Sequence, residues 1–142
     1  MSERIFLEWL PDDPDSPFPP TANALPEPNG LLAAGGDLSP ARLLNAYRQG
    51  IFPWYSEGNP ILWWSPAPRC VLLPAEVHLS HRTRRRFNGG AYHITLNQAF
   101  EDVVQACAAP RPGEPGTWIT AEMATAYQRM YHLGYAHSLE VW

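Results

Sequence analysis

The hydrophobic and polar positions of the first half of the chain predict one clear helix among many turns. The helix covers residues 40–49: Ser39 can cap its start, and Gly50 can end it in the left-handed conformation. Apolar or aromatic side chains recur at helical spacing on one face, at Leu43, Leu44 and Tyr47. We expect Arg42 and Gln49 to lie toward solvent on the opposite side.

The second half has a different pattern, in which short apolar strands alternate with capped helices. In chain order we expect a strand at 70–73, a helix capped by Ser80 that runs through Phe87, a strand at 91–96, a helix capped by Asn97, a loop at 110–115, a helix capped by Thr120 and a strand at 136–142. The order β-α-β-α-α-β predicts a mixed α/β fold.

A change in composition near residue 68 predicts two domains. Most of the 16 prolines precede it, so residues 1–67 read as a Pro- and aromatic-rich N-terminal domain and residues 68–142 as a second domain. The last strand, Ser138–Trp142, is apolar and has no turn or partner after it. We therefore expect the chain to be the N-terminal part of a longer polypeptide.

Composition narrows the class of protein. The 142 residues are 45% hydrophobic and 17% charged, which is typical of one or two globular domains, and they contain neither a membrane-length apolar run nor a signal peptide. Cys70 and Cys107 lack metal-ligand spacing and are expected to be buried, reduced thiols, which favours a cytoplasmic protein. The net charge of −4 hides an acidic start and an arginine-rich remainder, so a nucleic-acid partner is not excluded.

Aromatic residues in Pro- and Gly-rich loops are the first candidates for ligand binding. Tyr47, Trp54, Tyr55 and Trp118 could converge on one pocket, where an indole can stack on a base or adenosine. Trp63, Trp64 and Trp142 are interpreted as packing residues. For Trp54 and Trp118, packing and binding remain equal alternatives at this point.

The segment HLSHRTRRRF, residues 78–87, is the second candidate. As a helix it would place Arg82, Arg85 and Arg86 at i, i+3 and i+4 in one basic ridge, with Arg84 beside it. No acidic residue occurs between Glu76 and Glu101. Such a ridge is typical of contact with a phosphate backbone, although a solvated helix face explains it equally well.

Other chemistry is not indicated. Gly35–Asp37 has neither the spacing nor the lysine of a phosphate-binding loop, and no nucleophile–base set or metal-ligand cluster stands out. We therefore expect no metal and no cofactor, and the residue types favour binding over catalysis.

Four blocks of sequence resemble the bacterial leucyl/phenylalanyl-tRNA–protein transferases: PNGLLAAGGDLSPARLLNAYRQGIFPWY, PILWWSPAPR, GTWIT and LGYAHSLEVW. The resemblance implies a small N-terminal domain followed by the first part of a GNAT-like acyltransferase domain. It implies transfer of Leu or Phe from an aminoacyl-tRNA to the N-terminal Arg or Lys of a protein, which marks that protein for degradation by the N-end rule. It also implies a monomer that needs no cofactor.

The resemblance implies site residues as well. Tyr47, Trp54, Trp118 and Tyr127 would bind the aminoacyl-adenosine, and the basic stretch Arg82, Arg84, Arg85 and Arg86 would contact tRNA. The catalytic residues would lie beyond Trp142, so none is assigned. Two alternatives stay open: a non-catalytic tRNA or nucleic-acid binding module or inactive fragment, and an acyl-CoA-dependent acetyltransferase. The second would need a Gly-rich pyrophosphate loop that is not visible in the sequence.

Overall fold

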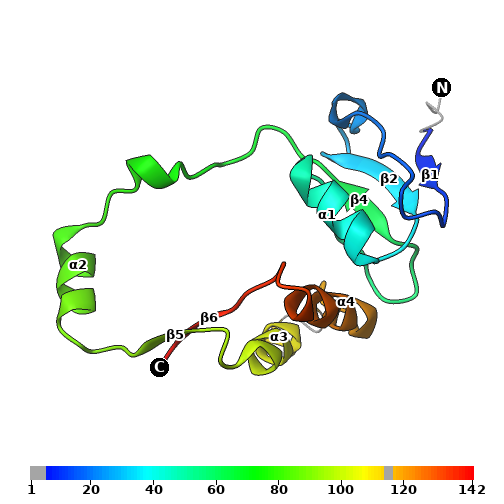
Figure 1. The fold of residues 1–142 in the computed structure, drawn as a ribbon. Helices are drawn as coiled ribbons and strands as arrows, with labels where there is room; N and C mark the ends of the chain where they lie inside the picture. The colour runs from blue at the N-terminus through cyan, green and yellow to red at the C-terminus, as the bar shows by residue number, and fades with distance from the viewer. Residues whose placement is uncertain (1–5, 114–116) are drawn as a thin grey trace.

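The computed structural model describes residues 6–113 and 117–142. Within them the chain forms four α-helices and two β-sheets, so the mixed α/β fold class is confirmed (Figure 1). The strands are β1 Glu8–Leu10, β2 Leu31–Gly35, β3 Phe52–Pro53, β4 Leu62–Trp64, β5 Ile94–Leu96 and β6 Leu139–Val141. The α-helices are α1 Pro40–Arg48, α2 His81–Asn88, α3 Phe100–Ala108 and α4 Ala121–His132, and short 3-10 turns lie at Thr21–Asn23 and Pro74–Glu76.

The N-terminal sheet has the strand order β1-β2-β4-β3 and carries α1. β1 is parallel to β2, whereas β4 is antiparallel to both β2 and β3. Ala33 in β2 stands opposite Trp63 in β4, and its small side chain leaves room for the indole. Trp63 is fully buried and donates from Nε1 to the carbonyl of Gly35 at 2.9 Å. The predicted packing role of Trp63 is therefore confirmed.

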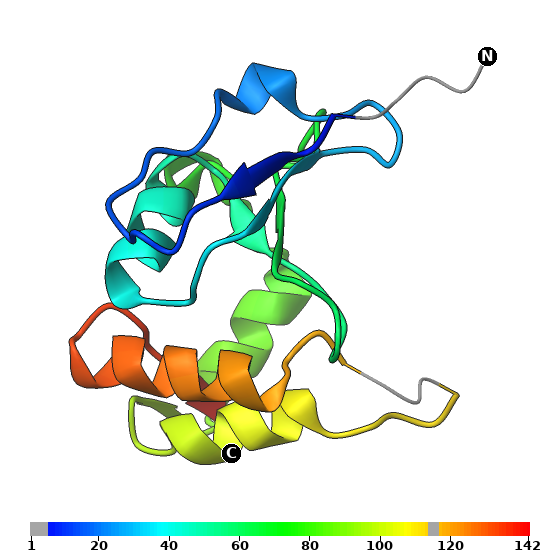
Figure 2. The ribbon, with the colours of Figure 1, turned by 90° about the vertical axis from the view of Figure 1, so that its right-hand side faces the viewer.

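One hydrophobic core joins this sheet to the second half of the chain. Leu43 and Ala46 of α1 pack in the same cluster as Ala126 and Met130 of α4. Figure 2 shows α3 and α4 side by side beneath the N-terminal sheet and α1. The position of α4 relative to α1 is therefore set by apolar packing between residues about 80 positions apart in the sequence.

A small second sheet pairs β5 with β6 in antiparallel register. Between these strands in sequence lie α3 and α4, which are joined by the stacked rings of Phe100 and Tyr131 at 4.2 Å. The sequence predicts that Asn97 caps α3, and this prediction is wrong. Asn97 has φ 59° and accepts at Oδ1 from the Ser138 N–H at 3.0 Å. The buried carboxylate of Glu140 instead accepts from the Ala99 N–H, at the start of α3, at 3.2 Å.

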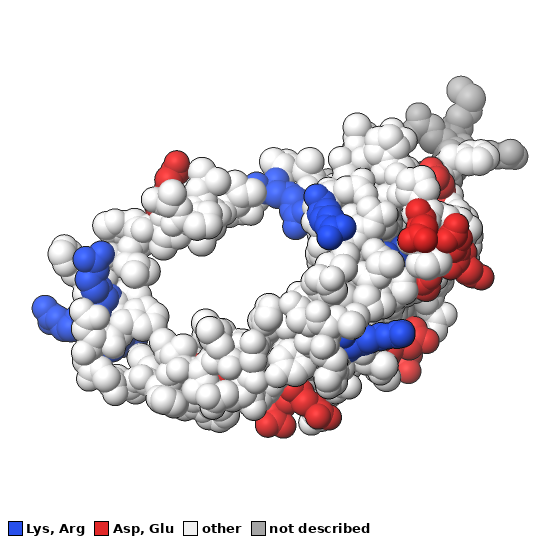
Figure 3. Space-filling view, viewed as in Figure 1, with Lys and Arg blue, Asp and Glu red and all other residues white. Residues whose placement is uncertain are grey.

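Residues 65–93 leave the N-terminal sheet, carry α2 and return at β5. Together with the helices they surround an opening that Figure 3 shows passing through the molecule. The predicted strand at 70–73 is wrong: these residues form no strand, and Val71, Leu72 and Leu73 are 75%, 75% and 53% exposed. An apolar run becomes a strand only when a neighbour supplies hydrogen bonds, and no strand of the described residues pairs with this run.

Three caps predicted from the sequence are confirmed. Ser39, Ser80 and Thr120 each accept from the backbone N–H three residues later, at the starts of α1, α2 and α4. The prediction for Cys70 and Cys107 is half right, because neither is disulfide-bonded but both are exposed. Pro115, at the end of the predicted loop, lies outside the described residues.

Arg42 is the largest departure from the predicted helix faces. It is 0% exposed rather than solvated. Its guanidinium donates to the carbonyls of Pro11 and Asp13 at 2.7 and 2.6 Å, because the segment after β1 folds over this side of α1.

None of the helices within residues 6–113 and 117–142 has the length and apolar content needed to cross a membrane. The same residues contain no group of three His, Cys, Asp or Glu side chains suited to a metal ion.

Candidate binding site

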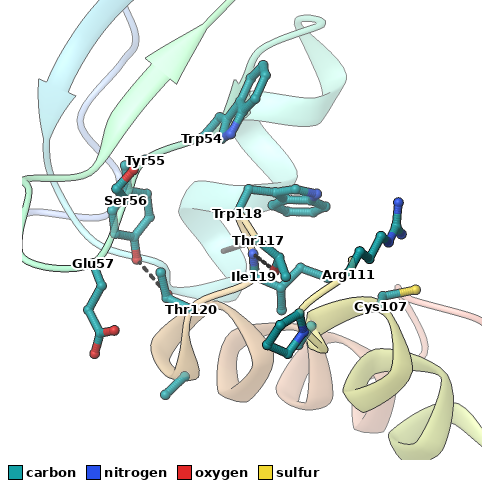
Figure 4. A pocket seen from close by; sticks show the side chains of 13 residues that line it. Trp54, Tyr55, Ser56, Glu57, Cys107, Arg111, Thr117, Trp118, Ile119 and Thr120 are labelled. Carbon is teal, nitrogen blue, oxygen red and sulfur yellow. Dashed lines mark hydrogen bonds between the residues drawn. The ribbon is translucent and has the colours of Figure 1, made fainter. Parts of the chain in front are cut away.

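A cavity of about 820 Å³ lies where the end of β3, the end of α3 and the start of α4 meet. Trp54 and Trp118, from two segments far apart in the sequence, both border it, and Figure 4 shows them among its lining side chains. The rest of its wall contains both polar and apolar residues: Tyr55, Ser56, Glu57, Cys107, Ala108, Pro110, Arg111, Thr117, Ile119, Thr120 and Ala121. The composition suits a ligand with both a flat apolar part and hydrogen-bonding groups.

The backbone around Trp54 is fixed, while its ring is left open. Its N–H donates to the Leu62 carbonyl at 2.9 Å, and its own carbonyl accepts from Trp64 Nε1 at 2.7 Å. The two indoles are tilted at a centroid distance of 6.4 Å. Trp54 nevertheless remains 56% exposed. A rigid, exposed aromatic face of this kind can stack on a planar ligand with little loss of conformational entropy.

Trp118 is held by the segment that starts α4. The Thr117 hydroxyl accepts from the Ile119 N–H at 2.9 Å, and the Thr120 N–H donates to the Trp118 carbonyl at 3.2 Å. The Trp118 ring meets Tyr127 edge-on at 6.2 Å and is 41% exposed. The turn that holds the Trp118 backbone therefore leads directly into Thr120, the residue that caps α4.

Tyr47 on α1 and Tyr127 on α4 are hydrogen-bonded through their hydroxyls. Burial raises the pKa of both phenols, and in Tyr127 the bond to Tyr47 raises it further. Both groups are therefore neutral at physiological pH and act as hydrogen-bonding hydroxyls.

The four predicted aromatic residues thus come together in space as a connected set. Trp54 and Trp118 border the cavity, Tyr127 touches Trp118, and Tyr47 touches Tyr127. Tyr55, also considered in the sequence, is buried and donates to the Glu122 carboxylate at 3.3 Å. Burial is the main cause that raises its pKa.

The basic stretch forms the predicted helix, α2, which lies across the opening from α1 (Figure 1). All of its residues are exposed, and Figure 3 shows basic side chains gathered over it. Within the described part of the chain no carboxylate pairs with an arginine of α2, since the one ion pair found there joins Arg42 and Asp37. The ridge of Arg82, Arg85 and Arg86, with Arg84 beside it, is therefore not paired with a carboxylate in the described part of the chain.

Sequence reasoning missed two arginines near the aromatic set. Arg111 borders the 820 Å³ cavity, and Arg69 borders a neighbouring one. Arg69 donates from Nη1 to the Gly50 carbonyl at 2.7 Å, a contact across 19 residues that leaves no periodic signal in the sequence.

Most of the chain matches one known protein family. Residues 71–142 match a family described as leucyl/phenylalanyl-tRNA protein transferase, and residues 36–67 match the N-terminal domain of the same family. The chain is 58% identical over 137 residues to the leucyl/phenylalanyl-tRNA–protein transferase of Stutzerimonas stutzeri, which covers 96% of this chain and 60% of that protein.

Two further relatives carry the same name. The protein of Alkalilimnicola ehrlichii is 56% identical over 137 residues, which is 96% of this chain and 53% of the relative. The protein of Xanthomonas euvesicatoria is 60% identical over 127 residues, which is 89% of this chain and 51% of the relative. The chain therefore spans between about half and three fifths of the length of these relatives.

Proposed function

The chain belongs to the leucyl/phenylalanyl-tRNA protein transferase family, and we propose that it binds the aminoacyl-adenosine end of an aminoacyl-tRNA for transfer of Leu or Phe to a protein. The acceptor is the N-terminal Arg or Lys of a protein that is thereby marked for degradation. The proposed enzyme is a cytoplasmic monomer. The family match does not favour a non-catalytic nucleic-acid module or an acyl-CoA acetyltransferase.

One observation carries the proposal: two half-exposed indoles, Trp54 and Trp118, border the same cavity. A base stacked on an aromatic side chain gains about 1–3 kcal/mol, and every base offers a flat face. Tyr127 meets Trp118 edge-on, and its hydroxyl is hydrogen-bonded to that of Tyr47, which borders the neighbouring cavity; we propose that this neutral pair supplies hydrogen bonds to the ribose or to the ester. The basic ridge of α2 would contact the tRNA backbone farther away.

The reaction is aminolysis of an ester. The free α-amino group of the acceptor attacks the ester carbonyl, an amide bond forms, and the 3′ oxygen of the adenosine leaves and takes up a proton. The barrier falls when the amine and carbonyl are held together and when donors meet the developing oxyanion.

We assign binding and orientation of the ester to this chain. The amine-deprotonating group and the oxyanion donors are proposed to lie in the part of the relatives' length that the chain does not span, which is about 40% of the S. stutzeri protein. The apolar side chains exposed along residues 71–73 offer a surface against which that part could pack.

Binding is tested with a non-hydrolysable, amide-linked phenylalanyl-adenosine and the variants Trp54→Ala and Trp118→Ala. Each variant should weaken binding about 5- to 100-fold, because each loses one stacking face. Trp9→Ala is the matched control, since Trp9 is 66% exposed but lies on β1. Equal losses in all three variants, or none in the first two, would contradict the assigned site.

Catalysis is tested by transfer of radiolabelled Phe from its tRNA to a protein that begins with Arg. The 142-residue chain should bind the aminoacyl-tRNA without transferring the amino acid. Transfer should appear when the part of the S. stutzeri relative that this chain does not match is added as a second polypeptide. Transfer by the chain alone would refute our placement of the catalytic groups.

A further inference from the structure

A second cavity, of about 450 Å³, adjoins the first. Trp118 is the one described side chain that borders both. The other residues around the second cavity come from the end of α1, from β3 and from the segment after β4: Tyr47, Gly50, Ile51, Phe52, Pro53 and Arg69. Trp118 is therefore a wall shared by the two cavities, so a ligand stacked against it in the first cavity lies next to the second.

Arg69 is the charged group of this second cavity, and its position is fixed by two contacts. Nη1 donates to the carbonyl of Gly50 at 2.7 Å, and the guanidinium carbon lies 5.4 Å from the centre of the Phe52 ring. Gly50 has φ +73° at the end of α1, a conformation that suits glycine and directs its carbonyl to this side. Of the five N–H donors of Arg69, only one is used within the described residues.

The charge of Arg69 is not balanced by a neighbour. Within residues 6–113 and 117–142 the only carboxylate–arginine pair is Arg42 with Asp37. Figure 3 shows basic side chains at this rim of the opening, where the end of α1 meets the segment that follows β4. A guanidinium with free donors in a fixed plane is the group that best matches a phosphate, because it can donate two parallel hydrogen bonds.

We propose that Arg69 binds the phosphodiester on the 5′ side of the terminal adenosine. This inference rests on the proposed function, since the adenosine must first stack on Trp54 and Trp118. The 5′ phosphate is attached to the same ribose as the esterified hydroxyl, so it lies within one nucleotide of the stacked base. Arg69 is thereby distinguished from the arginines of α2, which would meet backbone farther along the tRNA.

The test compares two amide-linked analogues, phenylalanyl-adenosine and the same compound extended at its 5′ oxygen by a cytidylyl phosphodiester. The intact 142-residue chain should bind the dinucleotide analogue about tenfold more tightly, which corresponds to one charge-assisted phosphate contact. Arg69→Ala should abolish this gain while leaving the affinity for phenylalanyl-adenosine unchanged, which also shows that the variant is folded. Arg69→Lys should restore part of the gain, because it keeps the charge without the planar fork.

Arg129→Ala is the matched control: it removes one exposed arginine from the last turn of α4. It should keep the full gain. Three results would overturn the Arg69 assignment. The gain could be lost equally in Arg129→Ala, or it could survive in Arg69→Ala. It could also be reproduced by adding inorganic phosphate to phenylalanyl-adenosine. If neither analogue bound the unmodified chain, the proposed function itself would fail, and the subsite with it.

Discussion

Arg42 provides the sharpest test of how this fold is held together, and we predict that Arg42→Met is strongly destabilising. The side chain has no solvent-exposed surface. Nη2 donates two short hydrogen bonds, to the carbonyls of Pro11 and Asp13. Nη1 makes a longer one to Ser16 at 3.5 Å, and the guanidinium carbon lies 5.9 Å from the centre of the Phe18 ring. The side chain thus ties the segment after β1 to α1.

The magnitude follows from the two short bonds. A hydrogen bond from a charged donor contributes about 1.5–3 kcal/mol, so two contribute about 3–6 kcal/mol. Part of this is offset in the variant, because Pro11 and Asp13 are exposed residues whose carbonyls can regain water, and because methionine refills the aliphatic space. We therefore expect the free energy of unfolding to fall by about 2–4 kcal/mol.

The competing argument is that burying a charge is itself costly. Replacement of a buried ionic group by an apolar one of similar size can be neutral or stabilising. Nε of Arg42 adds to that cost, since it has no hydrogen-bond partner and lies 3.9 Å from the Asp37 carboxylate. We expect the hydrogen bonds to prevail because they join the segment after β1 to α1, and a methionine side chain has no donor to replace them.

Urea unfolding followed by tryptophan fluorescence measures the effect, since Trp63 packs against Phe18 in the same core. Arg42→Lys should be intermediate, because its ammonium keeps a charged donor but loses the Nη1 bond to Ser16 and the planar group beside the Phe18 ring. Asp37→Asn is the control for the ion pair and should cost less than about 1 kcal/mol. An Arg42→Met protein as stable as the unmodified chain, or more stable, would refute the reasoning.

Two further predictions concern charge. Replacing Arg82, Arg85 and Arg86 together with Ala should weaken tRNA binding. The slope of log affinity against log salt should become shallower by about 1 for each phosphate that the protein no longer neutralises. An unchanged slope would show that the ridge is not part of the binding surface. Glu140→Gln should destabilise the fold at pH 7, because hydrogen bonds from the hydroxyls of Ser138 and Thr95 and from the Ala99 N–H lower the pKa of the carboxyl. This stabilisation is present above about pH 4.5 and is lost as the pH falls through the lower folded pKa, so the unfolding curves of the two proteins should converge in acid.

Local signals in the sequence predicted where helices begin better than they predicted which distant segments contact each side chain. Ser39, Ser80 and Thr120 begin helices because a cap needs only a side-chain oxygen and the next turn of backbone. The prediction for Asn97 failed because its side chain is engaged by a distant segment: Oδ1 accepts from the Ser138 N–H, and α3 begins after Ala99 without a side-chain cap. Arg42 was misplaced for the same kind of reason, since a segment some 30 residues earlier in the chain covers its face of α1.

The aromatic set was predictable only in part. Aromatic residues beside Pro and Gly suggested Trp54 and Trp118, yet nothing local linked Tyr47 to Tyr127, which lie 80 residues apart and form a hydrogen bond. Arg69 was not predicted because its partners, Gly50 and Phe52, precede it in the sequence by more than the length of β4, so no local pattern links them to it. The binding roles of all these residues remain predictions until the variants are measured.

The same packing explains why binding should be separable from transfer. The cavity depends on where α4 sits, and α4 is fixed by Ala126 and Met130 in the core that also contains Leu43 and Ala46 of α1. That core is already formed within this chain, so the segments that carry the two indoles are placed next to each other by residues of this chain. Residues 71–73, in contrast, have the apolar pattern of a buried strand but remain exposed. The core beneath the aromatic residues is complete, whereas the apolar segment 71–73 is uncovered. We therefore expect this chain to bind the aminoacyl-adenosine without catalysing transfer of its amino acid.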